Sequence, residues 1–297
     1  MSKCLVTGGS GFIGSHIVEY LLDKRHDVTV VDNQSANNDK FYWRYETNNI
    51  KSDICDFGKL VDAMKGIEYV FHLAAESRLQ PAIENPIQAV YRNCVGTTTV
   101  LQAARETGVK RVVYSSTSSG YGNNSCPNVE TQPDDCLNPY SVSKISAEKI
   151  CKMYSELYGL ETVSLRYFNV FGERSPQKGQ HAPVIGIFQR QRDAGQPLTL
   201  VGDGSQRRDF VYVKDVAKAN YLAAFSDLRG HVGEVFNVGS GKNYSIKDIA
   251  DAISDNQVFL PARGGEMDYT FANIDKIKEV LGWKPEVDVI EWVYGQK

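Results

Sequence analysis

The chain has 297 residues, of which 42% are hydrophobic, and its formal net charge at pH 7 is −3. This length can bury one large core or two lobes, and the small charge gives no electrostatic reason to expect nucleic acid or an anionic membrane as a partner. No apolar run reaches the roughly 18 residues of a membrane span and no signal-peptide pattern opens the chain, so we expect a cytoplasmic protein that spans no membrane.

The first expected elements are a strand, a glycine-rich turn, a helix and a second strand. The apolar run Lys3 to Thr7 predicts a strand, and the turn Thr-Gly-Gly-Ser-Gly-Phe-Ile-Gly begins at its last residue. Apolar residues at helical spacing follow Gly14, and the β-branched run Asp27 to Val31 predicts a strand that leads into Asp32. This order is typical of the βαβ unit that binds a dinucleotide.

The chemistry of this unit indicates which dinucleotide it binds. Gly8, Gly11 and Gly14 allow a tight turn and close approach to a pyrophosphate, while the helix N-terminus offers free N–H groups. Asp32 follows Gly14 by eighteen residues, where a carboxylate accepts hydrogen bonds from ribose hydroxyls and repels a 2′-phosphate. A glycine turn alone often marks only a loop, but strands on both sides and Asp32 favour dinucleotide binding. Asp32 further favours NAD over NADP.

Strands and long helices continue to alternate along the chain. This alternation predicts an α/β fold with a Rossmann-type, doubly wound parallel sheet, whose active site forms at the carboxyl ends of the strands. The six cysteines show no CxxC spacing, so we expect reduced structural thiols and no metal site. The further expected elements are strands at 69–73, 111–116 and 162–167 and long helices at 85–107 and 140–158.

The character of the chain changes after Asn169, where glycine and proline become frequent and arginines gather. We expect residues 1–168 to form the NAD-binding Rossmann domain, with a return segment near 211–238. Residues 169–297 are expected to form a smaller α/β substrate-binding lobe. Arginine suits such a lobe where the substrate carries phosphate groups, because its fixed donors can hold them.

A tyrosine and a lysine four residues apart provide a candidate for proton transfer. On a helix, Tyr140 and Lys144 share one face, and the ammonium is expected to favour the phenolate and lower the pKa of the tyrosine. Such a pair also arises by chance on many helices. Thr117, which follows a predicted strand, is expected to be exposed at the sheet edge, where it could hydrogen-bond a substrate hydroxyl and Tyr140. A plain serine-rich turn is an equal alternative.

Several motifs resemble one family over nearly the whole chain. The chain is similar to extended short-chain dehydrogenase/reductases of the NAD-dependent nucleotide-sugar epimerase and dehydratase family, in particular the UDP-hexose 4-epimerases. The motifs are Thr-Gly-Gly-Ser-Gly-Phe-Ile-Gly at 7–14, Asp-Ile at 53–54, His-Leu-Ala-Ala at 72–75, Asn-Cys-Val-Gly-Thr at 93–97, Ser-Ser-Thr at 115–117, Tyr-Ser-Val-Ser-Lys at 140–144, Arg-Tyr-Phe-Asn-Val-Phe-Gly at 166–172 and Arg-Asp-Phe-Val-Tyr-Val at 208–213.

The resemblance implies roles for individual residues. It implies Thr117, Tyr140 and Lys144 as the catalytic residues. The implied NAD-binding residues are Gly8, Gly11, Phe12, Ile13, Gly14, Asp32, Asn33, Asp53, Ile54, Leu73, Ala74, Ala75, Asn93, Ser115, Tyr140, Lys144 and Tyr167. The implied substrate-binding residues are Glu76, Thr117, Ser118, Tyr140, Asn169, Thr199, Arg208, Arg263 and Thr270.

The residues after Thr117 bear on the reaction. Related 4,6-dehydratases carry Asp-Glu there, because eliminating water needs an acid and a base, and related decarboxylases usually keep the glutamate. This chain has Ser118 and Ser119 instead. The simplest remaining chemistry is epimerisation at C4 through a 4-keto sugar. The small Thr270 aligns with a residue that gates the sugar pocket, so a UDP-hexose or a UDP-N-acetylhexosamine is expected as substrate.

Two other interpretations stay open. One is a different NAD-dependent conversion of a nucleotide sugar, by a 3,5-epimerase, reductase, dehydratase or decarboxylase. The other is a non-catalytic dinucleotide-binding protein, although silent relatives often lose the tyrosine or the lysine. The resemblance also implies a homodimer in which the two long helices and their copies form a four-helix bundle, whereas a monomer in which the helices only cover the sheet is the plain alternative.

Overall fold

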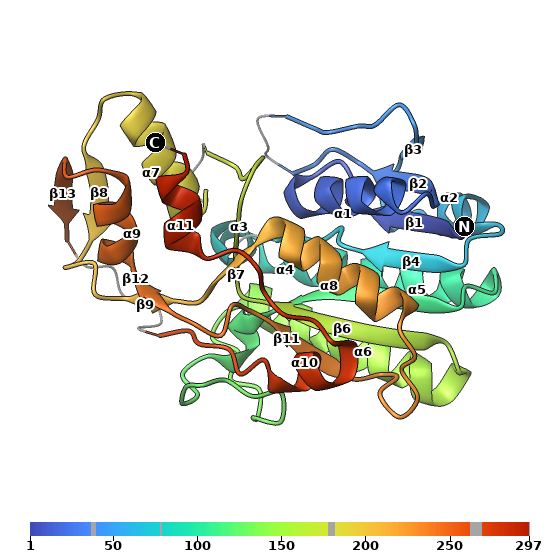
Figure 1. Cartoon of the computed structure of the whole chain (residues 1–297). Coiled ribbons are helices and arrows are strands. Elements are labelled where there is room, and N and C mark those ends of the chain that lie inside the picture. The colour runs from blue at the N-terminus through green and yellow to red at the C-terminus, as the bar shows by residue number, and fades with distance from the viewer. Residues whose placement is uncertain (37–39, 78, 178–181, 262–268, 297) are drawn as a thin grey trace.

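The computed structural model describes residues 1–36, 40–77, 79–177, 182–261 and 269–296 (Figure 1). Within them, seven parallel strands form one sheet in the order β11-β6-β5-β4-β1-β2-β3. This confirms the α/β, doubly wound Rossmann-type fold. The strands are β1 (Lys3–Thr7), β2 (Asp27–Asp32), β3 (Asn48–Lys51), β4 (Tyr69–His72), β5 (Arg111–Thr117), β6 (Glu161–Tyr167) and β11 (Val235–Val238).

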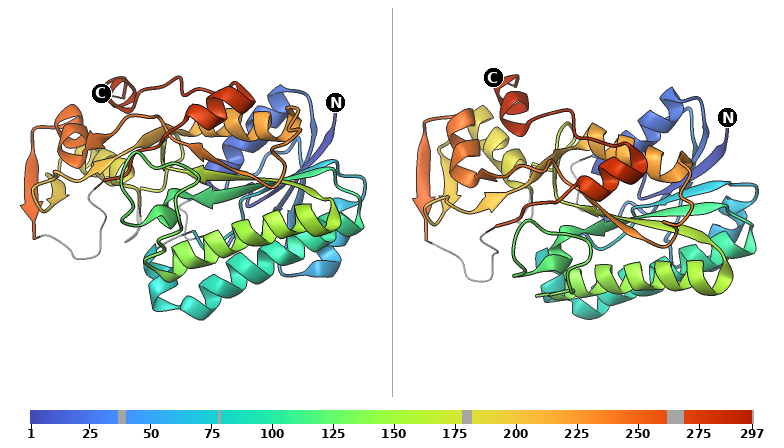
Figure 2. Two further views of the ribbon diagram at one scale, coloured as in Figure 1. Left: turned by 90° about the horizontal axis from the view of Figure 1, so that it is seen from below. Right: turned by 60° about the horizontal axis from the view of Figure 1, so that its bottom comes forward.

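Helices cover both faces of the sheet, which explains why its central strands are continuous apolar runs. On one face, α1 (Phe12–Asp23) lies against α8 (Val213–Phe225), with α10 (Asp275–Leu281) beside α8 (Figure 1). On the other face, α5 (Gly96–Glu106) lies between α2 (Phe57–Met64) and α6 (Pro139–Tyr158); Figure 2 shows α5 and α6 side by side. The helices on each face of the sheet bury a separate apolar cluster against the strands.

The expected long helix over 85–107 is present as one unbroken helical segment over 86–106, with a π-helical turn in its middle. The segment forms α4 (Pro86–Val90), a π-helical turn (Tyr91–Val95) and α5, and a further short helix, α3 (Leu79–Glu84), precedes it. The wide turn coincides with the buried amide of Asn93, which hydrogen-bonds the backbone of Glu76 and the hydroxyl of Ser143. Such π-helical turns are frequently found at functional sites.

The boundaries of α6 follow from capping residues. Asn138 caps the first turn by accepting a hydrogen bond from Ser141 N–H at 2.9 Å, and Pro139 occupies the first helical turn, where its missing N–H costs nothing. At the other end, Gly159 adopts a left-handed conformation with φ of 69° and stops the helix. The helix therefore begins one residue before Tyr140, as the sequence predicted to within a residue.

The remaining elements pack around a third apolar cluster, at the left of Figure 1. Three strand pairs lie there: β7 (Asn169–Phe171) with β10 (Phe210–Tyr212), β8 (Leu198–Val201) with β13 (Gln257–Leu260), and β9 (Arg207–Arg208) with β12 (Tyr244–Ser245). The helices are α7 (Val184–Asp193), α9 (Ile246–Ile253) and α11 (Val289–Tyr294). The chain returns to the central sheet through α8 and β11, and the division into two domains stays a prediction.

Two further findings bear on the expectations for the chain as a whole. All six cysteines are free thiols, and Cys4 and Cys151 are buried in the apolar clusters of the two sheet faces. In the part of the chain that the structure describes, no helix combines the length and apolar character needed to cross a membrane.

Candidate active site

A cleft of about 720 Å³ opens at the carboxyl ends of the sheet strands. It is lined by the glycine turn, by residues that follow β2, β3 and β4, by the end of β5 and by the start of α6. All three predicted catalytic residues line it, as do all the predicted NAD-binding residues except Asn93. Segments far apart in the sequence thus meet at the sheet edge that the fold class predicts for a ligand.

The glycine turn has no room for side chains. A Cβ on Gly14 would lie 2.2 Å from the carbonyl oxygen of Gly8, and a Cβ on Gly8 would lie 2.8 Å from the backbone nitrogen of Ala74. Gly8 also has a φ of +69°, which L side chains rarely adopt. The turn, followed by the N-terminus of α1, therefore forms a backbone cradle that fits a dinucleotide diphosphate.

The carboxylates at the end of β2 and just after β3 are fixed by hydrogen bonds. Asp32 accepts bonds from Ser10 N–H at 3.1 Å and Gln34 N–H at 2.7 Å. Asp53 accepts bonds from Cys55 N–H at 2.9 Å and from the amide of Asn33 at 2.8 Å. Burial acts to raise the pKa of Asp53, but these hydrogen bonds outweigh it, so the pKa lies below its ordinary value. Both groups are thus pre-positioned acceptors for ribose hydroxyls or for the amine of a base.

A buried histidine fixes the backbone beyond β4. His72 Nδ1 lies 2.7 Å from the hydroxyl of Thr7, and its Nε2 lies 3.0 Å from the hydroxyl of Thr97. The Thr7 hydroxyl also accepts bonds from the N–H groups of Leu73 and Ala74, each at 3.2 Å, so its proton points to Nδ1. Burial lowers the pKa of His72 to about 3, so the ring is neutral at physiological pH and holds the cleft-lining segment in place.

The catalytic candidates lie together, but their electrostatics differ from the expectation. Burial raises the pKa of Tyr140, whereas a hydrogen bond with the Thr117 side chain acts to lower it. The predicted lowering by Lys144 is therefore wrong in its net direction, because burial of the phenol dominates. Burial also lowers the pKa of Lys144 itself to about 8, since an ammonium is costly to bury.

Thr117 also differs from its prediction. Its residue is only 6% exposed, so the expected exposure at the sheet edge is wrong, although it does line the cleft. The reason is that β5 is a central strand, buried along its whole length. The Thr117 hydroxyl donates a hydrogen bond to the hydroxyl of Ser119 at 3.1 Å and accepts one from Ser119 N–H at 3.1 Å. Its position is therefore set before any ligand binds.

A buried ion pair supports the helix that carries the tyrosine and the lysine. Glu148, one turn beyond Lys144 on α6, accepts hydrogen bonds from Arg166 Nε at 2.9 Å and Nη2 at 2.8 Å. It also accepts a bond from the hydroxyl of Ser116. The guanidinium of Arg166 further contacts Asp134 at 3.1 Å and stacks on the ring of Tyr121. The network joins α6 to β5 and β6 directly behind the cleft.

Several predicted site residues lie outside the cleft lining. Asn93 lies behind the cleft wall, where its side-chain amide hydrogen-bonds the backbone of Glu76. Asn169 donates from its amide to Thr270 Oγ1 at 3.3 Å, and Thr270 also accepts a bond from Asp209 N–H. Thr199 accepts a bond from the Gln191 amide at 2.9 Å. Ser118 and Arg208 are likewise outside the lining of the cleft, and Arg263 lies outside the described residues.

The cleft also contains residues for which the sequence predicted no individual role, although Ser116, Phe168 and Val170 lie within the family motifs. They are Val31, Ser35, Ala36, Ser52, Ser77, Pro81, Glu84, Arg92, Ser116, Phe168, Val170, Pro176 and Pro183. Ser116 and Arg92 each adjoin a motif residue, which is a usable signal. Pro176 and Pro183 come from the segment after β7, and no local pattern connects that segment with the cleft.

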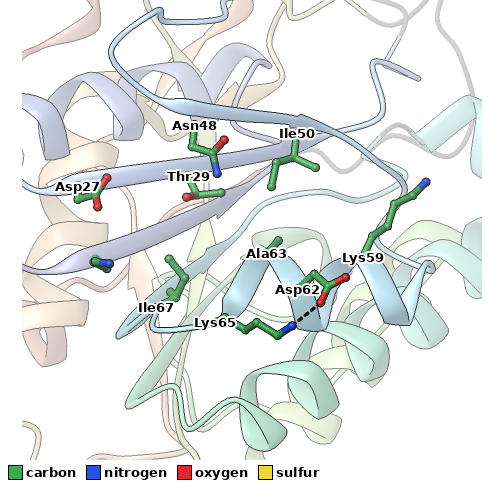
Figure 3. A pocket seen from close by; sticks show the side chains of 10 residues that line it. Asp27, Thr29, Asn48, Ile50, Lys59, Asp62, Ala63, Lys65 and Ile67 are labelled. Atoms are coloured by element: carbon green, nitrogen blue, oxygen red, sulfur yellow. Dashed lines mark hydrogen bonds and ion pairs between the residues drawn. The ribbon is translucent and has the colours of Figure 1, made fainter.

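A second hollow lies at the opposite edge of the sheet (Figure 3). It measures about 430 Å³ and lies at the amino ends of β1, β2 and β3, beside α2. Two of its lysines pair with carboxylates on the same helix: Lys65 with Asp62 at 2.6 Å and Lys59 with Asp56 at 3.1 Å. These exposed pairs are a solvated surface arrangement, so the carboxyl-end cleft is the better candidate for the active site.

The family of the chain follows from residues 4–239, which match the NAD dependent epimerase/dehydratase family. The chain belongs to this family. One relative in it, the UDP-glucose 4-epimerase of Mycolicibacterium smegmatis, is 34% identical over 98% of this chain and 96% of its own length. NAD is accordingly the cofactor of this chain, as of other NAD dependent epimerases.

Two solved structures of this epimerase family resemble the chain over nearly its whole length. The UDP-N-acetylglucosamine 4-epimerase from Methanobrevibacter ruminantium, in complex with UDP-N-acetylmuramic acid, superposes with a TM-score of 0.89 at 35% identity, covering 100% of this chain and 99% of its own. The UDP-glucose 4-epimerase from Thermus thermophilus, in complex with NAD, gives 0.88 at 33% identity, with 98% and 96% covered. Family and relatives together make the chain an NAD-dependent 4-epimerase.

Proposed function

We propose that the protein inverts C4 of a UDP-hexose or a UDP-N-acetylhexosamine through a 4-keto intermediate. The observation that carries this proposal is that Thr117, Tyr140 and Lys144 border the same cleft as the glycine cradle. A proton acceptor and a dinucleotide site thus share one cavity. The residues after Thr117 are serines, and the Ser119 hydroxyl is engaged with Thr117, so no carboxylate follows there for elimination of water.

Each residue of the site has its own role in the proposed reaction. The glycine turn would hold NAD, with Asp32 and Asp53 at its adenosine end. When bound there, NAD would supply the acceptor for the hydride of C4 and the donor that returns this hydride to the other face of the sugar. Tyr140 takes the proton of the 4-hydroxyl and later gives it back. Lys144 stabilises the phenolate by its charge, and Thr117 orients the sugar hydroxyl against Tyr140. The raised pKa of Tyr140 makes this help from Lys144 and Thr117 necessary.

The choice of sugar rests on relatives and on one side chain. Related proteins are named for UDP-glucose and for UDP-N-acetylglucosamine. Thr270 is small and lies against Asn169. We therefore include N-acetylated sugars among the substrates, with Asn169, Arg208, Thr199 and Arg263 proposed as contacts of the nucleotide diphosphate and base.

Incubation with single nucleotide sugars tests the proposed function. The protein is mixed with UDP-glucose, UDP-N-acetylglucosamine or UDP-glucuronate, without added reductant, and the anomeric proton signals are followed by NMR. A new signal of the C4-inverted sugar with either neutral hexose supports the proposal and names the substrate. If only UDP-glucuronate is converted, or none of the three, the proposed substrate class is wrong. The Tyr140→Phe variant serves as the inactive control.

We also propose that the protein forms a homodimer through a four-helix bundle of α5, α6 and their copies, and acts in the cytoplasm. Apolar side chains are exposed along this face: Leu157 is 69% exposed, and Val95, Val142 and Tyr158 are more than 40% exposed. Light scattering on wild type and on a Leu157→Glu variant tests the assembly. A dimeric wild type and a largely monomeric variant support the bundle, whereas a monomeric wild type contradicts it.

A further inference from the structure

Among the described residues that line the cleft, two are cationic: Lys144 and Arg92. Lys144 is buried, lies one helical turn after Tyr140 on α6 and has a role in the proposed chemistry. Arg92 takes no part in the proposed chemistry. Four carboxylates line the same cleft, those of Asp32, Asp53, Glu76 and Glu84. A diphosphate entering here adds further negative charge, so the position of Arg92 matters for binding.

Arg92 interacts with two of these carboxylates. It belongs to the π-helical turn that precedes α5, and its Nη1 contacts Glu76 Oε2 at 3.2 Å. It is also close enough to Asp53 for its charge to help lower the pKa of that carboxyl. Glu76 follows β4 and Asp53 follows β3, so the guanidinium reaches along the cleft from the sheet face that carries α2 and α5. The glycine turn and α1 approach the cleft from the other face.

The hydrogen bonding of this arginine is incomplete. Its Nε is buried without a hydrogen-bond partner among the described residues, although its side chain as a whole is 32% exposed. An ordinary surface ion pair with Glu76 would contribute little and would not explain why a buried donor stays unpaired. Nε itself is not accessible from the cleft, but the exposed part of the guanidinium at the cleft wall is well suited to phosphate oxygens, which accept N–H bonds from its planar fork.

We infer that Arg92 is a second ligand for the diphosphate of NAD, facing the glycine turn from the opposite wall of the cleft. Glu76 holds the guanidinium in place, and the neighbouring Asn93 fixes Glu76 in turn through its backbone. The backbone N–H groups of the turn and the charge of Arg92 then hold the phosphates from two sides. This inference rests on the placement of NAD in the cleft proposed above.

Binding measurements with parts of the cofactor test the inference. The dissociation constants of NAD, ADP and adenosine are measured by calorimetry for wild type, Arg92→Gln and Arg92→Lys. Loss of one charge-assisted hydrogen bond predicts that Arg92→Gln weakens NAD and ADP about tenfold or more, while adenosine changes less than about twofold. Arg92→Lys is expected to recover part of the loss. Arg229→Gln is the matched control, because Arg229 is 91% exposed and pairs with Asp227.

Two results overturn the inference. If Arg92→Gln binds NAD and ADP as wild type does, Arg92 is only an ion-pair partner of Glu76. If adenosine loses as much affinity as ADP, Arg92 contacts the nucleoside and not the phosphates. Thermal unfolding of each variant shows whether it is folded; should Arg92→Gln not fold, the comparison of Arg92→Lys with wild type decides by the same criterion.

A further variant separates this inference from the proposed function. Gly14→Ala places a Cβ against the Gly8 carbonyl, so it must weaken NAD if the cofactor lies in the cleft. If neither Gly14→Ala nor Arg92→Gln affects NAD, the placement of the cofactor is wrong, and the inference fails with it. If both weaken NAD but no sugar is inverted, the reaction is wrong and the role of Arg92 stands.

Discussion

The ammonium nitrogen of Lys144 lies 4.3 Å from the centre of the Tyr114 ring. Tyr114 is fully buried in β5, and its hydroxyl donates a hydrogen bond to the backbone carbonyl of Lys144 at 3.3 Å. The ring face offers the buried cation some electrostatic compensation. Burial nevertheless lowers the pKa of Lys144 to about 8, so its charge changes within the pH range in which the enzyme can be assayed.

The first prediction concerns the pH dependence of kcat/KM. As pH rises through about 8, Lys144 loses its proton and with it the charge that stabilises the phenolate of Tyr140, so kcat/KM is expected to fall on the alkaline side. In Lys144→Met this alkaline limb should be absent, NAD should bind more weakly, and activity should need a higher pH. A variant whose pH profile matches that of wild type would show that Lys144 does not act on the tyrosine.

Tyr140→Phe tests the proton acceptor itself. Removing the hydroxyl should lower turnover by roughly 10²–10⁴-fold, the usual contribution of a general base. NAD binding should stay intact, because the glycine turn and the carboxylates of Asp32 and Asp53 are untouched. A steady-state assay measures turnover, and the amount of NAD bound per chain is determined beside it. Retained turnover would contradict the proposed mechanism.

The neutral histidine behind the cleft predicts a loss of stability in acid. The folded-state pKa of His72 is about 3, below its ordinary value of 6.5, so the unfolded chain binds a proton that the folded chain does not. His72 alone should therefore lower the free energy of unfolding as pH falls from about 6.5 toward 3, by at most about 1.4 kcal/mol per pH unit. Urea unfolding of wild type and His72→Gln between pH 7 and pH 4 checks this; equal slopes would contradict it.

The ion pair between Glu148 and Arg166 predicts non-additive mutations. Arg166→Met leaves Glu148 buried without its charged partner, which should cost about 3–5 kcal/mol in the free energy of unfolding. Glu148→Met should cost a similar amount for the reverse reason. The double variant should be destabilised by much less than the sum of the two, and a denaturation cycle over the four proteins measures the difference. Additive effects would mean that the two side chains act independently.

The sequence predicted the parts of the site that are encoded locally. The glycine turn, Asp32 and the start of α6 are each specified by a few neighbouring residues, through backbone freedom or a helix cap. Family motifs then indicated Asp53, Ala74 and Ser115, all of which line the cleft. These predictions needed no knowledge of how distant segments pack.

The remaining features depend on tertiary packing. No local pattern predicts that the helix widens into a π-helical turn around Asn93, where the hydrogen bonds of the amide go to Glu76 and Ser143 in other segments. The raised pKa of Tyr140 and the burial of Thr117 follow from the depth of the site, which no spacing of residues reveals. The role inferred for Arg92 could not be predicted locally, because its partners Glu76 and Asp53 come from other segments.

The place of β11 has a consequence for the synthesis of the protein. This strand forms one edge of the central sheet and pairs with β6, yet the chain reaches it only at residues 235–238. During synthesis, one edge of β6 stays unpaired until β11 has been made, almost seventy residues after the end of β6. An unpaired strand edge invites pairing with other chains, so the growing polypeptide is most exposed to aggregation during this interval.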